Sequence, residues 1–173
     1  MFLLVDGYNI INAWSDLREI SQTNFDNART KLIEKLANYQ GFKKVTVILV
    51  FDAYLVKGGS RSVVKQNGLS IVYTKEAETA DNYIEKITKN MPKKYRVIVA
   101  TSDALEQLIV MGYGAERMTP KELKEEIELT EKSISKKIIN SRPVKNNLLM
   151  DNLDPEMQDF LENLRRQKGT NKI

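Results

Sequence analysis

The stretch VTVILVFDA, residues 45–53, carries the clearest secondary-structure signal in the chain. The seven residues from Val45 to Phe51 are all apolar or β-branched, which predicts a β-strand. Asp52 follows this strand directly, so a carboxylate is expected just beyond the strand's carboxyl end.

Segments on both sides of this strand alternate between strand-like and helix-like patterns. Apolar runs predict further strands at residues 2–5, 69–73, 97–100 and, more briefly, 115–118. Apolar residues at helical spacing predict helices at residues 25–40 (ended by Gly41), 79–90, 104–111 and, for about five turns, 120–141, with a short last helix from Asp154. The motif Thr119-Pro120-Lys121-Glu122 is a capping box with proline at the first helical position. Such alternation predicts an α/β fold, with a mostly parallel central sheet and helices on both faces.

Four aspartates stand at the ends of these elements. Asp6, Asp52 and Asp103 each follow a predicted strand, and Asp81 opens a predicted helix. Parallel sheets bind ligands outside the carboxyl ends of their strands. If the three strands are near neighbours, we therefore expect these carboxylates at one edge of the sheet.

Each aspartate also has a purely structural interpretation. Asp6 precedes a glycine, as in many turns, and Asp52 could simply end a strand. Asp81 would favour a helix macrodipole. Asp103 could be an N-cap, with Glu106 completing a capping-box-like pair.

The composition restricts the chemistry of such a site. The 173 residues include no histidine and no cysteine, which excludes disulfides, zinc–thiolate sites and Ser-His-Asp triads. A metal site must be built mainly from carboxylates, which suit Mg²⁺ or Mn²⁺. The formal charge of +4 is compatible with an anionic partner such as RNA. We expect no signal peptide and no membrane span, and the lack of cysteine fits the cytoplasm.

Several polar side chains are candidates for substrate binding, each with a structural alternative. Asn9 could bind a phosphate or close an Asx turn, and Arg29 could reach a phosphate or remain solvated. The hydroxyl groups that follow the predicted strand at residues 97–100 could contact substrate or cap the next helix. A basic loop at residues 57–62 could contact a phosphate backbone or simply be solvated. The residues in these last two groups are Thr101, Ser102, Lys57, Arg61 and Lys65.

The segments DGYNII, FDA, ETADNYIE and VATSDA, in this order, resemble a YacP-type NYN domain over roughly residues 1–140. NYN domains are relatives of PIN-domain ribonucleases. The resemblance implies a PIN-like three-layer α/β sandwich and a C-terminal extension at residues 141–173. It also implies an Mg²⁺-dependent endoribonuclease site that cleaves mRNA on the ribosome. Matched by motif, Asp6, Asp81 and Asp103 would be the catalytic metal ligands, with Asp52 supporting them.

The leading hypothesis is therefore a metal-dependent endoribonuclease that leaves 5′-phosphate and 3′-hydroxyl ends. An alternative is a PIN-like module that binds RNA or the ribosome without cleavage. A small-molecule phosphohydrolase is less consistent with the sequence, because Asp6-Gly7-Tyr8 lacks a second aspartate two residues on and no nucleotide-binding glycine loop is present.

Overall fold

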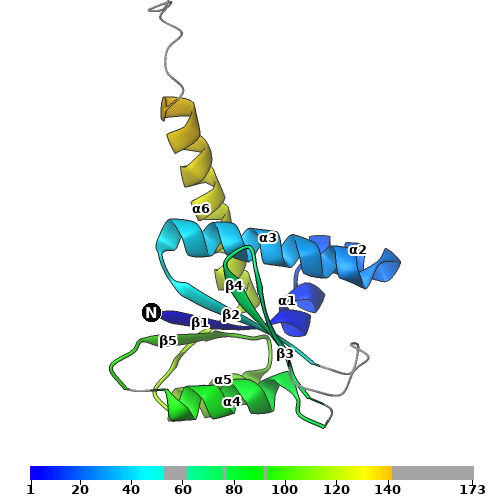
Figure 1. Cartoon of the computed structure of the whole chain (residues 1–173), viewed down its shortest axis with the longest axis vertical. Coiled ribbons are helices and arrows are strands. Elements are labelled where there is room, and N and C mark those ends of the chain that lie inside the picture. The colour runs from blue at the N-terminus through cyan, green and yellow to red at the C-terminus, as the bar shows by residue number, and fades with distance from the viewer. Residues whose placement is uncertain (53–61, 76, 92, 142–173) are drawn as a thin grey trace, which may run out of the picture. The chain divides into compact units, whose positions relative to one another are not determined.

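A computed structural model describes residues 1–52, 62–75, 77–91 and 93–141 of the chain. Strands and helices alternate along it (Figure 1). The strands are β1 (Phe2–Asp6), β2 (Thr46–Phe51), β3 (Ser62–Gln66), β4 (Leu69–Tyr73), β5 (Val97–Ala100) and β6 (Glu116–Met118). The helices are α1 (Gly7–Ala13), α2 (Ser15–Thr23), α3 (Phe25–Lys43), α4 (Ala80–Asn90), α5 (Ala104–Gly112) and α6 (Pro120–Ser141).

The strands form a six-stranded sheet in the order β3-β4-β2-β1-β5-β6. Every neighbouring pair is parallel except β3 and β4, which are antiparallel. In this register Val5 of β1 pairs with Leu49 of β2 and with Ala100 of β5. The strands that precede Asp6, Asp52 and Asp103 are therefore adjacent, and their carboxyl ends lie at one edge of the sheet. The predicted α/β fold is confirmed.

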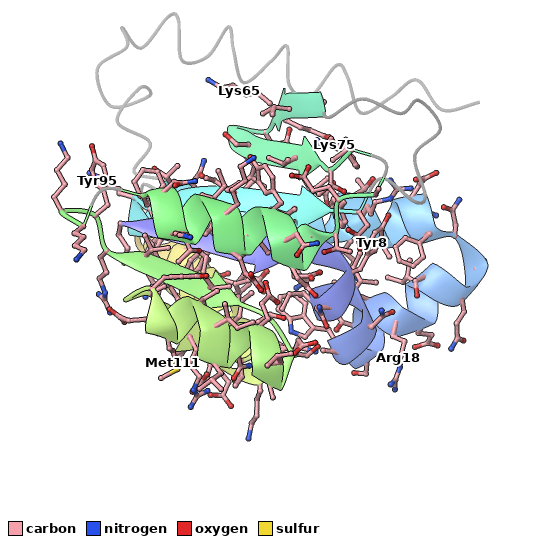
Figure 2. The ribbon with its side chains drawn as sticks, turned by 90° about the horizontal axis from the view of Figure 1, so that it is seen from below. Tyr8, Arg18, Lys65, Lys75, Tyr95 and Met111 are labelled. Atoms are coloured by element: carbon pink, nitrogen blue, oxygen red, sulfur yellow. The ribbon has the colours of Figure 1, made fainter. Side chains whose placement is uncertain are left out.

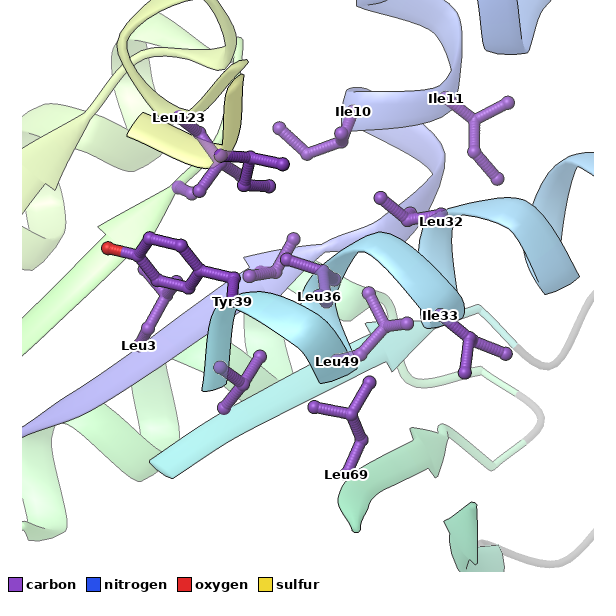
Figure 3. Close-up of a cluster of buried hydrophobic side chains, with 14 of the residues drawn as sticks. Leu3, Ile10, Ile11, Leu32, Ile33, Leu36, Tyr39, Leu49, Leu69 and Leu123 are labelled. Carbon is purple, nitrogen blue, oxygen red and sulfur yellow. The ribbon is translucent and has the colours of Figure 1, made fainter. Parts of the chain in front are cut away.

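Two hydrophobic clusters cover the two faces of the sheet, because successive strand side chains point to opposite faces. Leu3 and Val5 belong to one cluster, and Leu4 between them belongs to the other. The first cluster packs against α1, α3 and α6, and Figure 3 shows Leu32 and Leu36 of α3 among its members. The second packs against α4, on the opposite side of the sheet from α3 in Figure 1.

The predicted start of α6 agrees with the structure, whereas the predicted end of α3 does not. The capping box is formed, since the Thr119 hydroxyl accepts a hydrogen bond from the Glu122 amide and the Glu122 carboxylate accepts one from the Thr119 amide. The prediction that Gly41 ends the helix is wrong. The helix α3 continues to Lys43, and Lys44 supplies the left-handed residue with φ of 54°.

Three elements were not predicted. Helix α1 begins directly at the end of β1, where the sequence suggested a break, and the short helix α2 follows it. Gly7 is required at this junction, because a Cβ there would overlap the Phe51 ring. Strand β3 forms the antiparallel edge of the sheet, and it includes Lys65, which was predicted to lie by a basic loop.

The chain divides into two compact units, Met1–Ser135 and Lys136–Ile173. The predicted domain boundary near residue 140 stays a prediction. Lys57, Arg61 and the short helix expected from Asp154 lie outside the described residues. Within the described part of the chain, no helix has both the length and the apolarity needed to cross a bilayer.

Candidate functional site

Asp6 stands at the junction of β1 and α1 and is almost completely buried, with 3% of its surface exposed. It is the N-cap of α1. One carboxylate oxygen accepts a hydrogen bond from the Asn9 amide at 2.9 Å, and the other accepts one from the Asn9 side chain at 2.8 Å. Asn9 thus holds both oxygens of a buried carboxylate in a fixed orientation.

Two further carboxylates come to Asp6 from the first turns of α4 and α5. Asp81 is in the first turn of α4, and Glu106 is in the first turn of α5. One oxygen from each of the three side chains lies within 4.8 Å of the other two. Three elements that are distant in sequence therefore build one acidic centre, which we call the Asp6–Asp81–Glu106 cluster.

The electrostatics of this cluster favour a cation. Burial raises the pKa of Glu106 to about 8, a weaker interaction with Thr101 opposes the rise, and the charges of Asp81, Asp6 and Asp103 add to it. Burial likewise raises the pKa of Asp6 to about 6, against the hydrogen bonds from Asn9, and the charges of Asp81 and Asp52 add to the rise. Crowded, buried carboxylates resist ionisation unless a positive charge compensates them.

Glu106 gives the most direct indication of a missing partner. Only 2% of its surface is exposed, and among the described residues neither carboxylate oxygen has a hydrogen-bond partner of standard geometry, although the Thr101 side chain lies close enough to lower its pKa. An unpaired buried carboxylate is costly, and buried charges are normally paired or bound to a metal. The cluster therefore fits a divalent cation, and Asp6, Asp81 and Glu106 could hold one.

Asp52 lies beside the cluster and contacts the start of α4. Its carboxylate accepts a hydrogen bond from the Ala80 amide, one residue before Asp81. Burial raises the pKa of Asp52, the Ala80 hydrogen bond opposes this, and the charge of Asp81 adds to the rise. Asp52 therefore fixes the position of the helix turn that carries Asp81.

Asp103 is placed differently from the other predicted ligands. It is the N-cap of α5, and its carboxylate accepts hydrogen bonds from the amides of Leu105 and Glu106 at 2.7 and 3.1 Å. The structure does not include it in the group of converging carboxylates. The N-cap interpretation of Asp103 is confirmed, while its predicted role as a metal ligand stays a prediction.

Glu106 is the site residue that sequence reasoning missed as a candidate ligand. It was interpreted as the second half of a capping box, yet the Asp103 amide donates to the Thr101 hydroxyl instead. Glu106 shares the buried face of α5 with Val110, four residues later, while the intervening Leu108 is 67% exposed. That spacing is the only sequence signal, and the exposed leucines of the helix conceal it.

Polar residues after β5 support the Asp6 side of the cluster. The Ser102 hydroxyl donates a hydrogen bond to the side-chain oxygen of Asn9, whose amide group in turn donates to Asp6. Thr101 is fully buried, and its carbonyl accepts a hydrogen bond from the Gln107 side chain. Ser102 and Asn9 therefore orient Asp6, and Thr101 shapes the start of α5.

Tyr8 lies in the first turn of α1 (Figure 2), close enough to Arg29 for the arginine's charge to act on its hydroxyl group. One terminal nitrogen of Arg29 pairs with Asp26, but its Nε is buried and has no hydrogen-bond partner among the residues that the structure describes. The Tyr8 hydroxyl is also buried and unpartnered. Burial raises the pKa of Tyr8, the positive charge of Arg29 opposes the rise, and the negative charge of Asp52 adds to it. Two unused donors thus lie near the same edge of the sheet as Asp52.

Comparisons with known proteins agree with this architecture. A family model described as the YacP-like NYN domain matches residues 3–166. The YacP protein of Bacillus subtilis (strain 168) is 42% identical over 137 residues, which cover 79% of this chain and 80% of that protein. The crystal structure of Rae1 (YacP) from Bacillus subtilis superposes with a TM-score of 0.70 at 37% identity, covering 100% of this chain and 99% of that one. Its W164L mutant gives a TM-score of 0.69 at 34% identity, covering 95% of this chain and 99% of that one. The chain belongs to the nuclease-like YacP-like NYN domain family.

Proposed function

We propose that this protein is a metal-dependent endoribonuclease. The observation that carries the proposal is the convergence of Asp6, Asp81 and Glu106 at the carboxyl edge of the sheet, with both oxygens of Glu106 unpartnered. Membership in a nuclease-like family supports the same reaction class. Because all three proposed ligands are carboxylate oxygens, we propose that the ion is Mg²⁺, with Mn²⁺ able to replace it.

When bound, the cation would supply Lewis-acid polarisation of the scissile phosphate and activation of a water molecule. The protein supplies the positions of its ligands. Asn9 orients both oxygens of Asp6, and Asp52 holds the first turn of α4, from which Asp81 projects. Hydrolysis would leave 5′-phosphate and 3′-hydroxyl ends.

Arg29 and Tyr8 are the proposed phosphate-binding groups. The Nε of Arg29 and the Tyr8 hydroxyl are unpartnered donors, and both could pair with phosphate oxygens. Such contacts position a nucleic-acid backbone without reading its sequence. Thr101 and Ser102 make the structural contacts described above, and their predicted contact with substrate stays a prediction.

We further propose that the substrate is mRNA engaged by the ribosome in the cytoplasm. The resemblance to YacP-type proteins supports this partner, and the excess of basic residues is compatible with it. Lys57, Arg61 and Lys65 would contribute to the contact with RNA or with the ribosomal surface.

The decisive experiment compares Asp81→Asn with wild type on mRNA, both naked and during translation, with and without Mg²⁺. Glu125→Gln on α6 is the matched control, because it also removes one carboxylate charge, from an exposed residue. We expect wild type and E125Q to cleave translated mRNA only when Mg²⁺ is present. The cleavage rate of D81N should be lower than that of wild type by ~10²-fold or more, the usual effect of removing a group that stabilises the transition state. Full cleavage by D81N would refute the catalytic assignment. RNA binding by wild type without any cleavage would favour a non-catalytic module.

A further inference from the structure

A pocket of about 410 Å³ opens at the end of α4 that is farther from the acidic cluster. It lies where the carboxyl ends of α4 and α5 meet the amino end of β5. Its lining includes Thr88, Met91 and Val97 together with the polar or aromatic groups Lys93, Tyr95 and Tyr113. In Figure 2, Tyr95 and Tyr8 are labelled at opposite ends of α4. The volume is within the usual range for a small-ligand site.

Thr88 gives this pocket an unused hydrogen-bonding group. It is a buried residue in the last part of α4, with 5% of its surface exposed, and its hydroxyl oxygen has no hydrogen-bond partner within the described part of the chain. Native buried hydroxyl groups are normally paired with protein or water. An unpaired hydroxyl in the lining of a pocket therefore indicates a ligand with a polar edge.

Two exposed tyrosine rings and several lysines surround the same pocket. Tyr95 and Tyr113 both line the pocket, and they are 42% and 44% exposed. The Nζ of Lys89 lies 5.9 Å from the centre of the Tyr113 ring, and the Nζ of Lys94 lies 5.1 Å from that of Tyr95. Exposed aromatic faces beside cationic groups are the combination that binds stacked bases and their phosphates.

A second, more open pocket lies along α4 between this site and the turn that carries Asp81, and its lining also includes Glu85. It has a volume of about 350 Å³, shares Tyr113 with the first pocket, and extends along α4 through Lys89 and Lys86 to Asn82. Asn82 is the residue after Asp81. Because an α-helix rises 1.5 Å per residue, Asp81 and Thr88 are separated by about 10 Å along the axis, the length of about three stacked nucleotides.

We propose that the Thr88–Tyr113 pocket binds an unpaired base of the RNA strand, about three nucleotides from the bond that is cleaved. Tyr113 stacks on the base, the Thr88 hydroxyl pairs with its polar edge, and Lys86 and Lys89 contact the phosphates between the pocket and the acidic cluster. This assignment rests on the proposed ribonuclease function and gives it a substrate path along α4.

The test measures binding of a fluorescein-labelled, unstructured 12-nucleotide RNA by anisotropy, without divalent cations, so that cleavage does not interfere. We expect Tyr113→Ala to weaken binding about tenfold and Tyr113→Phe to retain it, because stacking requires the ring and not the hydroxyl. Thr88→Val, which replaces the hydroxyl by a methyl group, should weaken binding severalfold. Circular dichroism and thermal melting establish that each variant is folded.

Salt dependence provides a second readout. Lys89→Gln should lower the slope of log affinity against log salt by about 0.7, the value for one phosphate contact on a single strand. Lys121→Gln, a matched change at an exposed lysine of α6, should leave the slope unchanged. Equal binding by Y113A and Y113F, or an unchanged slope for K89Q, would overturn the pocket assignment, as would failure of the wild type to bind the RNA.

The two proposals can fail separately. If cleavage proves absent while Y113A and K89Q behave as expected, the ribonuclease proposal fails and the pocket still binds RNA. If Mg²⁺-dependent cleavage is lost in D81N but Y113A binds as well as wild type, the ribonuclease proposal stands and the pocket assignment falls.

Discussion

Asp103 and Glu106 lie one helical turn apart at the start of α5, and their carboxylates have opposite surroundings. The Asp103 carboxylate accepts two backbone hydrogen bonds and caps the helix. The Glu106 carboxylate is buried beside Asp6 and Asp81, and within the described part of the chain it makes no hydrogen bond of standard geometry. The cap fixes the first turn of α5, and that turn directs Glu106 into the acidic cluster.

The role of Asp103 can be separated from that of a metal ligand by two substitutions. Asp103→Ser retains a good N-cap and removes the carboxylate, so we expect the free energy of unfolding and the metal affinity to stay near wild type. Asp103→Ala removes the cap and should cost ~1 kcal/mol in urea unfolding. If D103S instead loses metal affinity by tenfold or more, in calorimetric titration with Mn²⁺, then Asp103 is a ligand as the sequence predicted.

Glu106→Gln should separate stability from metal binding. The pKa of Glu106 rises from 4.5 to about 8 on folding, so the folded chain binds this proton more tightly than the unfolded chain. Without metal, the resulting destabilisation is absent below pH 4, grows as the pH rises, and is complete above about pH 8. We therefore expect metal-free E106Q to be more stable than wild type by ~2 kcal/mol at pH 8.5, and nearly equal to it at pH 4.

The same variant should lose the stabilisation that Mg²⁺ gives to wild type, measured as the shift in melting temperature. E125Q should behave as wild type in both experiments, because its carboxylate is exposed. A metal-free E106Q that melts below wild type at pH 8.5 would contradict the buried, unpaired state of this carboxylate.

Asn9 should set the pH range in which the metal binds. Its two hydrogen bonds to Asp6 lower the pKa of that carboxyl group, against the effect of burial. Because protons compete with the cation, metal affinity should increase with pH through the pKa of about 6 of Asp6 and further through the pKa of about 8 of Glu106. Asn9→Ala keeps the backbone hydrogen bond to Asp6 and removes the one from the side chain, which raises the pKa of Asp6 further, so the lower part of the affinity profile should move to higher pH. Ser102→Ala, which loosens Asn9 only indirectly, should give a smaller shift, and coincident profiles for wild type and N9A would exclude the role of Asn9.

Two glycines should respond oppositely to alanine. Gly7→Ala would place a Cβ against the Phe51 ring at the junction of β1 and α1, so we expect a loss of ~1–3 kcal/mol of stability. Gly41→Ala lies inside α3, where a Cβ would meet nothing within 4 Å, and should stabilise the protein by ~0.5–1 kcal/mol. Urea unfolding of both variants checks the pair. A stable G7A would contradict the close packing of Gly7 on Phe51.

The missed elements are those whose local pattern is weak. Strand β3 exposes Val63 and Val64, and its pairing with β4, rather than a buried face, makes it a strand. Helix α2 has a largely polar sequence and buries only Leu17. Apolar periodicity detects elements through the face they bury, so an exposed edge strand and a short polar helix give little signal.

The sequence by itself determined the α/β architecture and the carboxylate chemistry. Long apolar runs must be buried, and strands alternating with amphipathic helices leave few alternatives to a parallel sheet. The lack of histidine and cysteine left oxygen ligands for any metal. Only the tertiary structure decided which carboxylates meet, because the directions of the first turns of α4 and α5 depend on packing between distant segments. That packing put Glu106 among the buried acidic groups and gave Asp103 to the helix cap.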